Sequence, residues 1–173
     1  MKNASRLGTF VLLIGVGLTL VGARAGGGAA PPGGVGAQEV TVLGVFLDER
    51  SQQINVVLQG KQDRRAFAMV IGPAEATGIA VPLQNLTPPR PLTHDLFLTL
   101  FARLNVRVTK VVINDIRDNI YYATVYLSAN GTPMELDSRP SDAIALAIRA
   151  KAPVYAEGRV FEKAPAVPTG PRI

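Results

Sequence analysis

The order of strand-like and helix-like segments limits the folds open to this chain more than any other feature of the sequence. Six β-rich runs occur in two blocks, and within each block only short polar connections separate them. Consecutive strands with short connections pair antiparallel, so each block is expected to form a three-stranded meander. The first block is EVTVLGVFLDE (39–49), QINVVLQG (53–60) and RAFAMVIG (65–72), and the second is VRVTKVVINDI (106–116), YYATVYLSA (121–129) and TPMELDS (132–138).

Turn residues support the second meander. Asp118-Asn119 is expected as a tight turn after its first strand. Asn130-Gly131 is the strongest hairpin signal in the chain, because a type I′ turn needs two residues that tolerate positive φ.

Helical segments lie between and after the two strand blocks. Pro73 suits the first turn of a helix and predicts one that runs to about Gln84. Thr93 is expected to cap a second helix, and Ser141 a third, AIALAIRA (143–150). The remaining expected elements are a short strand, VYAE (154–157), and one helical turn, GRVFEK (158–163).

This pattern argues for an α+β fold, a largely antiparallel sheet packed with two or three helices, rather than a doubly wound parallel sheet. The length of 173 residues suits a single domain. Helical spacing predicts which apolar side chains are buried against the sheet. The expected core residues are Leu96, Phe97, Leu100, Phe101, Leu104, Ile144, Ala147 and Ile148 on the helices, facing Val108, Val112, Val125 and Leu127 on the sheet.

The first 37 residues are expected to be a targeting segment followed by a linker. Lys2 and Arg6 precede an uncharged run, and Ala23-Arg24-Ala25 offers the small residues of a cleavage site, so residues 1–25 are predicted to be a signal peptide or an uncleaved N-terminal anchor. GGGAAPPGGVGA (26–37) favours neither helix nor strand and is expected as a flexible linker. The domain is expected at 38–163 and a flexible tail at 164–173. The protein is therefore expected to be exported, periplasmic or extracellular, or membrane-anchored by an uncleaved leader.

The composition excludes several kinds of site. With no Cys and one His, a single chain cannot form a disulfide, a thiolate zinc site, an Fe–S cluster or a two-His metal motif. Walker, G-x-S-x-G and H-E-x-x-H motifs are also absent from the sequence. The formal net charge of +5 is weak support for a nucleic-acid partner, because Lys2, Arg6 and Arg24 of the leader supply most of it.

The segment DSRPSD (137–142) is the most informative polar stretch. Pro140 holds Arg139 extended, and Asp142 lies in the first turn of the third helix, where a carboxylate meets the positive end of the helix dipole. Arg139 can pair with Asp137 or Asp142. One interpretation is a strand-to-helix corner whose charges satisfy one another, and the other is a polar site in which two carboxylates bind a divalent cation.

The segment RPLTHDL (90–96) holds the only His, a side chain that titrates near neutral pH. Thr93 and Asp95 have structural explanations as a cap and a first-turn carboxylate. His94 is either a hydrogen-bonding surface residue or a catalytic one.

Four segments together resemble the bifunctional nuclease domain family in order and spacing, over about Val40 to Ala164. They are IGPAEATGIA (71–80), RPLTHDLFLTLFARLNVRVTKVVI (90–113), the YYATVYL hairpin and LDSRPSDAIALAIRAKAPVY (136–155). The resemblance implies a curved mixed sheet, often in a homodimer, and DNase and RNase activity on a DNA or RNA substrate. The polar residues retained from the family's blocks are Glu75, Arg90, Thr93, His94, Asp95, Asp137, Arg139, Ser141 and Asp142.

Phosphodiester hydrolysis needs an activated water and neutralised phosphate charge, which Mg²⁺ or Mn²⁺ ions held by carboxylates commonly supply. The resemblance implies such a metal and no organic cofactor. The expected metal ligands are Asp95, Asp137 and Asp142; the expected catalytic residues are His94, Asp95 and Asp142; and the expected substrate-binding residues are Arg90, Arg139 and Ser141. This arrangement requires the two helix starts to converge in space.

A non-catalytic exported binding or regulatory domain of the same fold is the alternative, and an exported interaction module is a third interpretation. Convergence of Asp95, His94, Asp137 and Asp142 in one cleft favours the enzyme. Carboxylates that are dispersed, or saturated by backbone N–H groups and Arg, favour the other two. A membrane is expected as a partner only if the leader is uncleaved.

Overall fold

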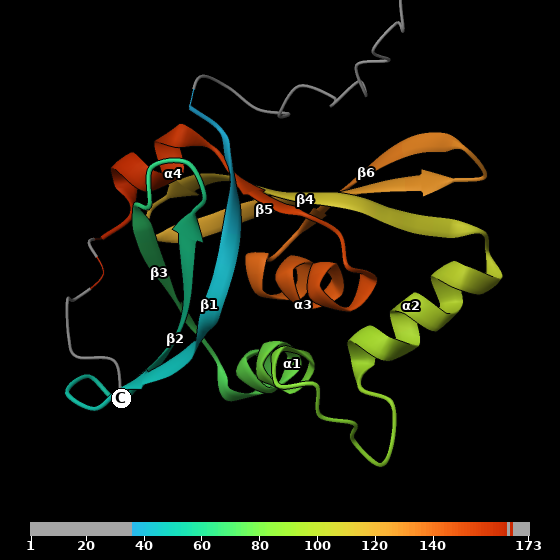
Figure 1. The fold of residues 1–173 in the computed structure, drawn as a ribbon, viewed down its shortest axis with the longest axis horizontal. Coiled ribbons are helices and arrows are strands. Elements are labelled where there is room, and N and C mark those ends of the chain that lie inside the picture. The colour runs from blue at the N-terminus through green and yellow to red at the C-terminus, as the bar shows by residue number, and fades with distance from the viewer. Residues whose placement is uncertain (1–35, 166, 168–173) are drawn as a thin grey trace, which may run out of the picture.

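The computed structural model describes residues 36–165 and 167, and the expected leader, most of the linker and most of the tail lie outside this range. The described chain forms one seven-stranded mixed sheet and four helices, which confirms the α+β class (Figure 1). The strands are β1 (Gln38–Asp48), β2 (Gln53–Gly60), β3 (Ala66–Ile71), β4 (Val106–Arg117), β5 (Ile120–Ala129), β6 (Thr132–Ser138) and β7 (Val154–Ala156). The helices are α1 (Pro73–Leu83), α2 (Thr93–Arg103), α3 (Pro140–Ala150) and α4 (Gly158–Lys163). Within the described residues, no helix has the length and apolar character needed to cross a bilayer.

Both meanders form as predicted, and the short strand β7 joins them. The strand order is β3-β2-β1-β7-β4-β5-β6. β7 pairs antiparallel with β1 and parallel with β4, and this parallel pair makes the sheet mixed. The two predicted turns of the second meander have positive φ at both central residues, 50° and 61° at Asp118 and Asn119 and 51° and 86° at Asn130 and Gly131. Such φ values are those of the hairpin turns that match strand twist.

The sheet is strongly curved. The Tyr121 hydroxyl on β5 donates a hydrogen bond of 2.9 Å to the Ala68 carbonyl on β3, although four strands separate β3 from β5 in the sheet order. The Phe67 ring packs edge-on against Phe161 of α4, with ring centroids 5.2 Å apart. The curvature therefore brings β3 of the first meander close to β5 of the second, and both meanders contribute to one apolar core.

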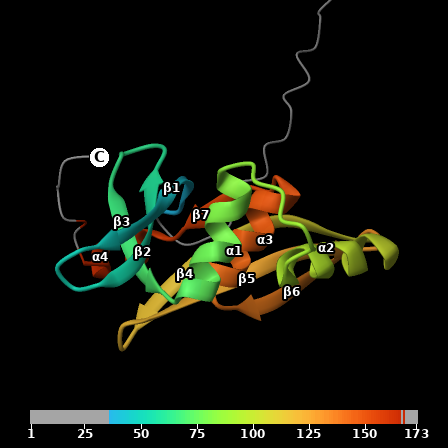
Figure 2. The same cartoon turned by 90° about the horizontal axis from the view of Figure 1, so that it is seen from below.

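The helices α1, α2 and α3 lie on the same side of the sheet, and α3 is the one that covers it (Figures 1 and 2). Ile144 and Ala147 of α3 are completely buried, as predicted, among Val111, Ile113 and Val125 of the sheet. The start of the fold differs slightly from the prediction, because Ala37, the last residue of the expected linker, is buried beside β1.

The predicted burial of the α2 stripe is wrong for most of its members. Only Phe101 packs against the core, and no residue of α2 is fully buried. Helical spacing correctly places these side chains on one face, but α3 already occupies the sheet surface that this face was expected to cover. The stripe residues left exposed are Leu96 (65%), Phe97 (48%), Leu100 (48%) and Leu104 (57%).

A matched pair of leucine truncations tests this distribution. Leu58 is fully buried and Leu96 is 65% exposed. We expect Leu58→Ala to lower the free energy of unfolding by about 2–5 kcal/mol, and Leu96→Ala to change it by about 0.5 kcal/mol or less. Urea unfolding of both variants measures the difference, and equal losses would contradict the exposed position of the α2 stripe.

Candidate functional site

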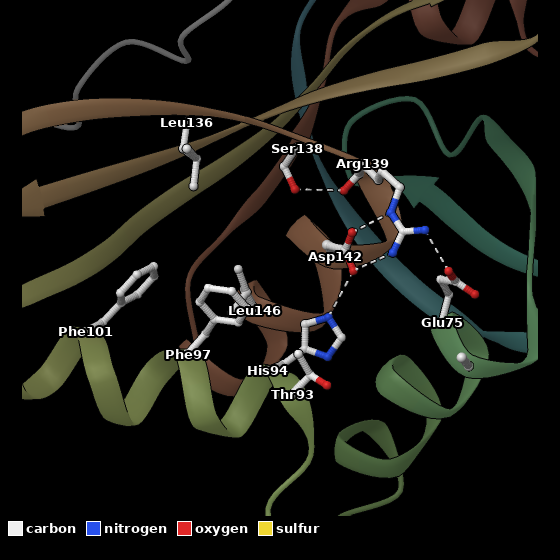
Figure 3. A pocket seen from close by; sticks show the side chains of 11 residues that line it. Glu75, Thr93, His94, Phe97, Phe101, Leu136, Ser138, Arg139, Asp142 and Leu146 are labelled. Carbon is white, nitrogen blue, oxygen red and sulfur yellow. Dashed lines mark hydrogen bonds and ion pairs between the residues drawn. The ribbon is translucent and has the colours of Figure 1, made fainter.

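The first turns of three helices meet at one open pocket of about 380 Å³ (Figure 3). Glu75 is the third residue of α1, His94 the second of α2 and Asp142 the third of α3. The convergence of the starts of α2 and α3, which the nuclease interpretation required, is therefore observed. The lining residues are Ala74, Glu75, Thr93, His94, Phe97, Phe101, Leu136, Ser138, Arg139, Asp142 and Leu146.

His94 and Asp142 form a side-chain pair across this pocket. The imidazole Nε2 lies 3.2 Å from the Asp142 Oδ1, and only 13% of the His94 side chain is exposed. An ionised carboxylate can only accept, so this contact places a proton on Nε2 and leaves Nδ1 with the free lone pair. Within the described residues Nδ1 makes no hydrogen bond, and it lies on the ring edge that faces Gly78 of α1.

Arg139 connects Asp142 to Glu75. Its Nε donates to Asp142 Oδ2 at 2.6 Å and its Nη2 to Oδ1 at 3.1 Å, while Nη1 donates to Glu75 Oε1 at 2.7 Å. These three bonds use three of the five guanidinium N–H donors. The side chain is 64% exposed, and its remaining two donors make no hydrogen bond within the described residues.

The four side chains form a continuous polar row, Glu75–Arg139–Asp142–His94, in Figure 3. Burial alone would raise the pKa of Asp142, but the hydrogen bonds from Arg139 and His94 outweigh it and hold the pKa below the ordinary 3.8. The Glu75 backbone N–H and Arg139 likewise lower the pKa of Glu75. With a neutral imidazole the row carries a formal charge of minus one.

The other half of the pocket is apolar. Phe97 and Phe101 project from α2, Leu136 from β6 and Leu146 from α3. The two phenyl rings lie 6.2 Å apart in an edge-on arrangement. The pocket therefore places an apolar wall directly beside an acid–base pair.

Asp95, predicted as a catalytic residue and metal ligand, does not line the pocket. Its Oδ2 accepts the Leu92 backbone N–H at 2.8 Å, and its Oδ1 accepts Arg149 Nε at 2.7 Å. The cap prediction is corrected here, because Leu92 is the N-cap of α2 and Thr93 its first residue, while Asp95 satisfies the Leu92 N–H. Asp95 thus stabilises the start of α2 and does not contribute to the pocket lining.

Three further predicted residues lie apart from the polar row. Asp137 is exposed on β6, paired in register with Thr124 of β5. Arg90 is exposed in the loop before α2. Ser141 is 8% exposed at the second position of α3, where Arg139 and not Ser141 is the N-cap. None of the three lines the pocket, and their predicted roles stay predictions.

The expected metal site is not assembled by its predicted ligands. Across residues 36–165, no three His, Asp or Glu side chains are grouped so that they could hold an ion. Of the expected set Asp95, Asp137 and Asp142, only Asp142 lines the pocket. The described residues therefore do not fit a three-carboxylate Mg²⁺ or Mn²⁺ site, and the need for a metal stays a prediction.

Sequence reasoning missed the positions of two side chains, one in the pocket wall and one beside the pocket. Phe97 was expected in the core and instead forms an open wall of the pocket. Arg149, to which the sequence analysis gave no role, is only 7% exposed and pairs with Asp95, 54 positions away. No local pattern could have revealed that pairing.

Comparison with known proteins identifies the family of this chain. A family model described as the bifunctional nuclease domain matches residues 56–168, well over half of the chain. The chain therefore belongs to the bifunctional nuclease domain family, as the resemblance in its polar blocks had predicted.

Individual relatives extend the match. An uncharacterized protein of Mycobacterium tuberculosis, found in strains CDC 1551 and H37Rv, is 35% identical over 126 residues, which cover 73% of this chain and 75% of the relative. A protein named bifunctional nuclease 1 from Oryza sativa is 33% identical over 81 residues, 45% of this chain and 24% of that protein. The chain thus matches only about a quarter of the plant nuclease.

The Asp95–Arg149 pair predicts a specific dependence of stability on pH. Burial alone would raise the pKa of Asp95, but the hydrogen bonds from Arg149 and the Leu92 N–H hold it below 3.8. A pKa lowered by folding stabilises the folded state above the unfolded-state value, and this stabilisation is lost as pH falls through the folded-state value. Asp95→Asn should therefore lower the free energy of unfolding by about 1.5–3 kcal/mol near neutral pH, and the loss should shrink below about pH 4. Urea unfolding across this range checks it, and a loss independent of pH would contradict it.

Proposed function

We propose that this protein is a nuclease that hydrolyses phosphodiester bonds of DNA or RNA at the pocket between α1, α2 and α3. The observation that carries the proposal is the His94–Asp142 pair, 3.2 Å apart, at the edge of an open pocket. An imidazole oriented by a carboxylate is a common general acid–base unit. Membership of the bifunctional nuclease domain family supports phosphodiesters as the substrate class.

The roles follow from the free atoms of the polar row. Nδ1 of His94 takes the proton from the attacking water as the water oxygen bonds to phosphorus, while Asp142 holds the Nε2–H and stabilises the imidazolium that forms. The P–O bond to the leaving oxygen breaks, and this oxygen takes up a proton from solvent. The two uncommitted N–H donors of Arg139 bind a phosphate oxygen. Proton uptake by His94 also cancels the formal negative charge of the row as negative charge develops on the phosphate.

Substitution of the pair tests the reaction. His94→Gln and Asp142→Asn should each lower kcat by about 10²–10⁴-fold on single- and double-stranded DNA and RNA, because proton transfer is lost. Asp118→Asn is the matched control, since Asp118 lies in an exposed turn with φ of 50°, which Asn tolerates. Unchanged turnover in both pocket variants would contradict the mechanism. Parallel assays with EDTA and with added Mg²⁺ or Mn²⁺ test the predicted metal.

A non-catalytic binding or regulatory domain is the second candidate, and one observation favours it. Arg139 engages Asp142 and Glu75, and Arg149 with the Leu92 N–H engages Asp95, so these carboxylates are satisfied within the protein. This candidate predicts that Asp142→Asn lowers the melting temperature while the wild-type protein shows no nuclease turnover.

A second copy of the chain is our proposed partner for the exposed α2 face. Leu96, Phe97 and Leu100 of α2, its C-cap Leu104, and Met134 and Leu136 of β6 are each 48–65% exposed. Contiguous apolar side chains exposed on a helix face are typical of a protein–protein contact. Export of the protein, with its leader cleaved or retained as an anchor, stays a proposal that rests on the sequence alone.

The assembly has a direct test. Wild-type protein should sediment as a dimer, and Leu100→Arg should produce monomers because it buries an unpaired charge in the interface. Ile120→Arg is the matched control, since Ile120 is 59% exposed but lies at the start of β5, away from α2. Monomeric wild-type protein, or dissociation by both variants, would contradict α2 as the interface.

A further inference from the structure

We infer that Gly78 and Arg149, which lie outside the pocket lining, are positioning residues that hold His94 in its working orientation. With Asp95 they form a group that we call the His94 frame. The inference rests on the proposed role of His94 and adds to it the residues that keep Nε2 at Asp142 and Nδ1 open.

Gly78 leaves room for the imidazole. A Cβ atom at this position would lie 2.9 Å from His94 Cε1 and 3.2 Å from Nδ1. Gly78 is buried in the middle of α1, where glycine costs about 1 kcal/mol relative to alanine. The proximity of the His94 ring therefore explains why glycine occupies this position, because any larger residue would displace the ring.

Arg149 ties the three helices together behind this ring. Its Nη1 donates to the Gly78 carbonyl of α1 at 2.5 Å and to the Ala145 carbonyl of α3 at 3.1 Å, and its Nε donates to Asp95 of α2 at 2.7 Å. The side chain is 7% exposed. Only a planar guanidinium presents several donors in the fixed directions that these acceptors require.

The frame acts on both the backbone and the ring of His94. Asp95, the next residue, holds Arg149 with one oxygen and the Leu92 N–H with the other, which fixes the first turn of α2. Gly78 faces the Cε1–Nδ1 edge of the ring, next to the Nε2 atom that meets Asp142. A displacement of about 1 Å in a catalytic group can cost about 10²-fold in rate.

The first experiment uses Gly78→Ala in the full chain without an affinity tag. His94 is the only His, so its Hε1 and Hδ2 protons give the only imidazole signals in an NMR spectrum. In the wild type we expect a nuclear Overhauser effect between Hε1 and the Gly78 Hα protons. Gly78→Ala should shift both ring signals and lower kcat about 10²-fold, with KM little changed. Thr77→Ala, at the neighbouring exposed position, is the control.

The size of the stability change separates positioning from a structural role. Alanine is the better helix former by about 1 kcal/mol, and displacing the packed ring costs a comparable amount, so Gly78→Ala should change the melting temperature little while it displaces the ring. Because Asp142 then no longer contacts the imidazole, adding Asp142→Asn should not move the ring signals further. Unchanged ring signals and kcat in Gly78→Ala would overturn the role of Gly78.

The second experiment compares Arg149→Lys with Arg103→Lys, an exposed arginine at the end of α2. Arg149→Lys keeps the charge but loses the planar set of N–H donors. We therefore expect displaced His94 signals and a lower kcat in Arg149→Lys, and no change in Arg103→Lys. Unmoved signals in Arg149→Lys would overturn the role of Arg149. The NMR measurement does not require turnover. An inactive wild-type protein would therefore refute the proposed nuclease, whereas displaced His94 signals in the variants would still show that Gly78 and Arg149 position the ring.

Discussion

The whole structure depends on the pairing of β7 between β1 and β4. Residues 154–156 pair antiparallel with β1 of the first meander and parallel with β4 of the second. This pairing joins the two meanders into one sheet. α3 directly precedes β7, so the same pairing holds α3 against the sheet face. The pocket exists because α3 then presents its first turn to those of α1 and α2.

Three helix starts at one place would attract anions through their unpaired N–H groups and dipoles. Here Glu75, Asp142 and Asp95 already occupy those starts, and two arginines lie among them. The polar row therefore keeps its formal charge of minus one with a neutral imidazole and is not cationic. Its chemistry depends on the one imidazole, that of His94, and on the two N–H donors of Arg139 that the row does not use.

The strands were predictable because the turn residues between them require special backbone angles, as the positive φ values at Asn130 and Gly131 show. The convergence of His94 with Asp142 was predictable only through the family's polar blocks. The stripe on α2 was misassigned because spacing reports that residues share a helix face and not what that face meets. Arg149 was missed since its partner Asp95 is distant in sequence, and a long-range ion pair leaves no local signal.

The position of β7 has a consequence for synthesis. The strand at the centre of the sheet follows six other strands along the chain, so β1 and β4 each keep an open edge until residues 154–156 have left the ribosome. Its pairing with β1 joins Val40 to Val154, a contact of very long sequence separation, which makes folding slow. A nascent chain of this protein therefore stays incompletely folded until residues 154–156 have been synthesised, and its unpaired strand edges are the kind of surface that chaperones protect.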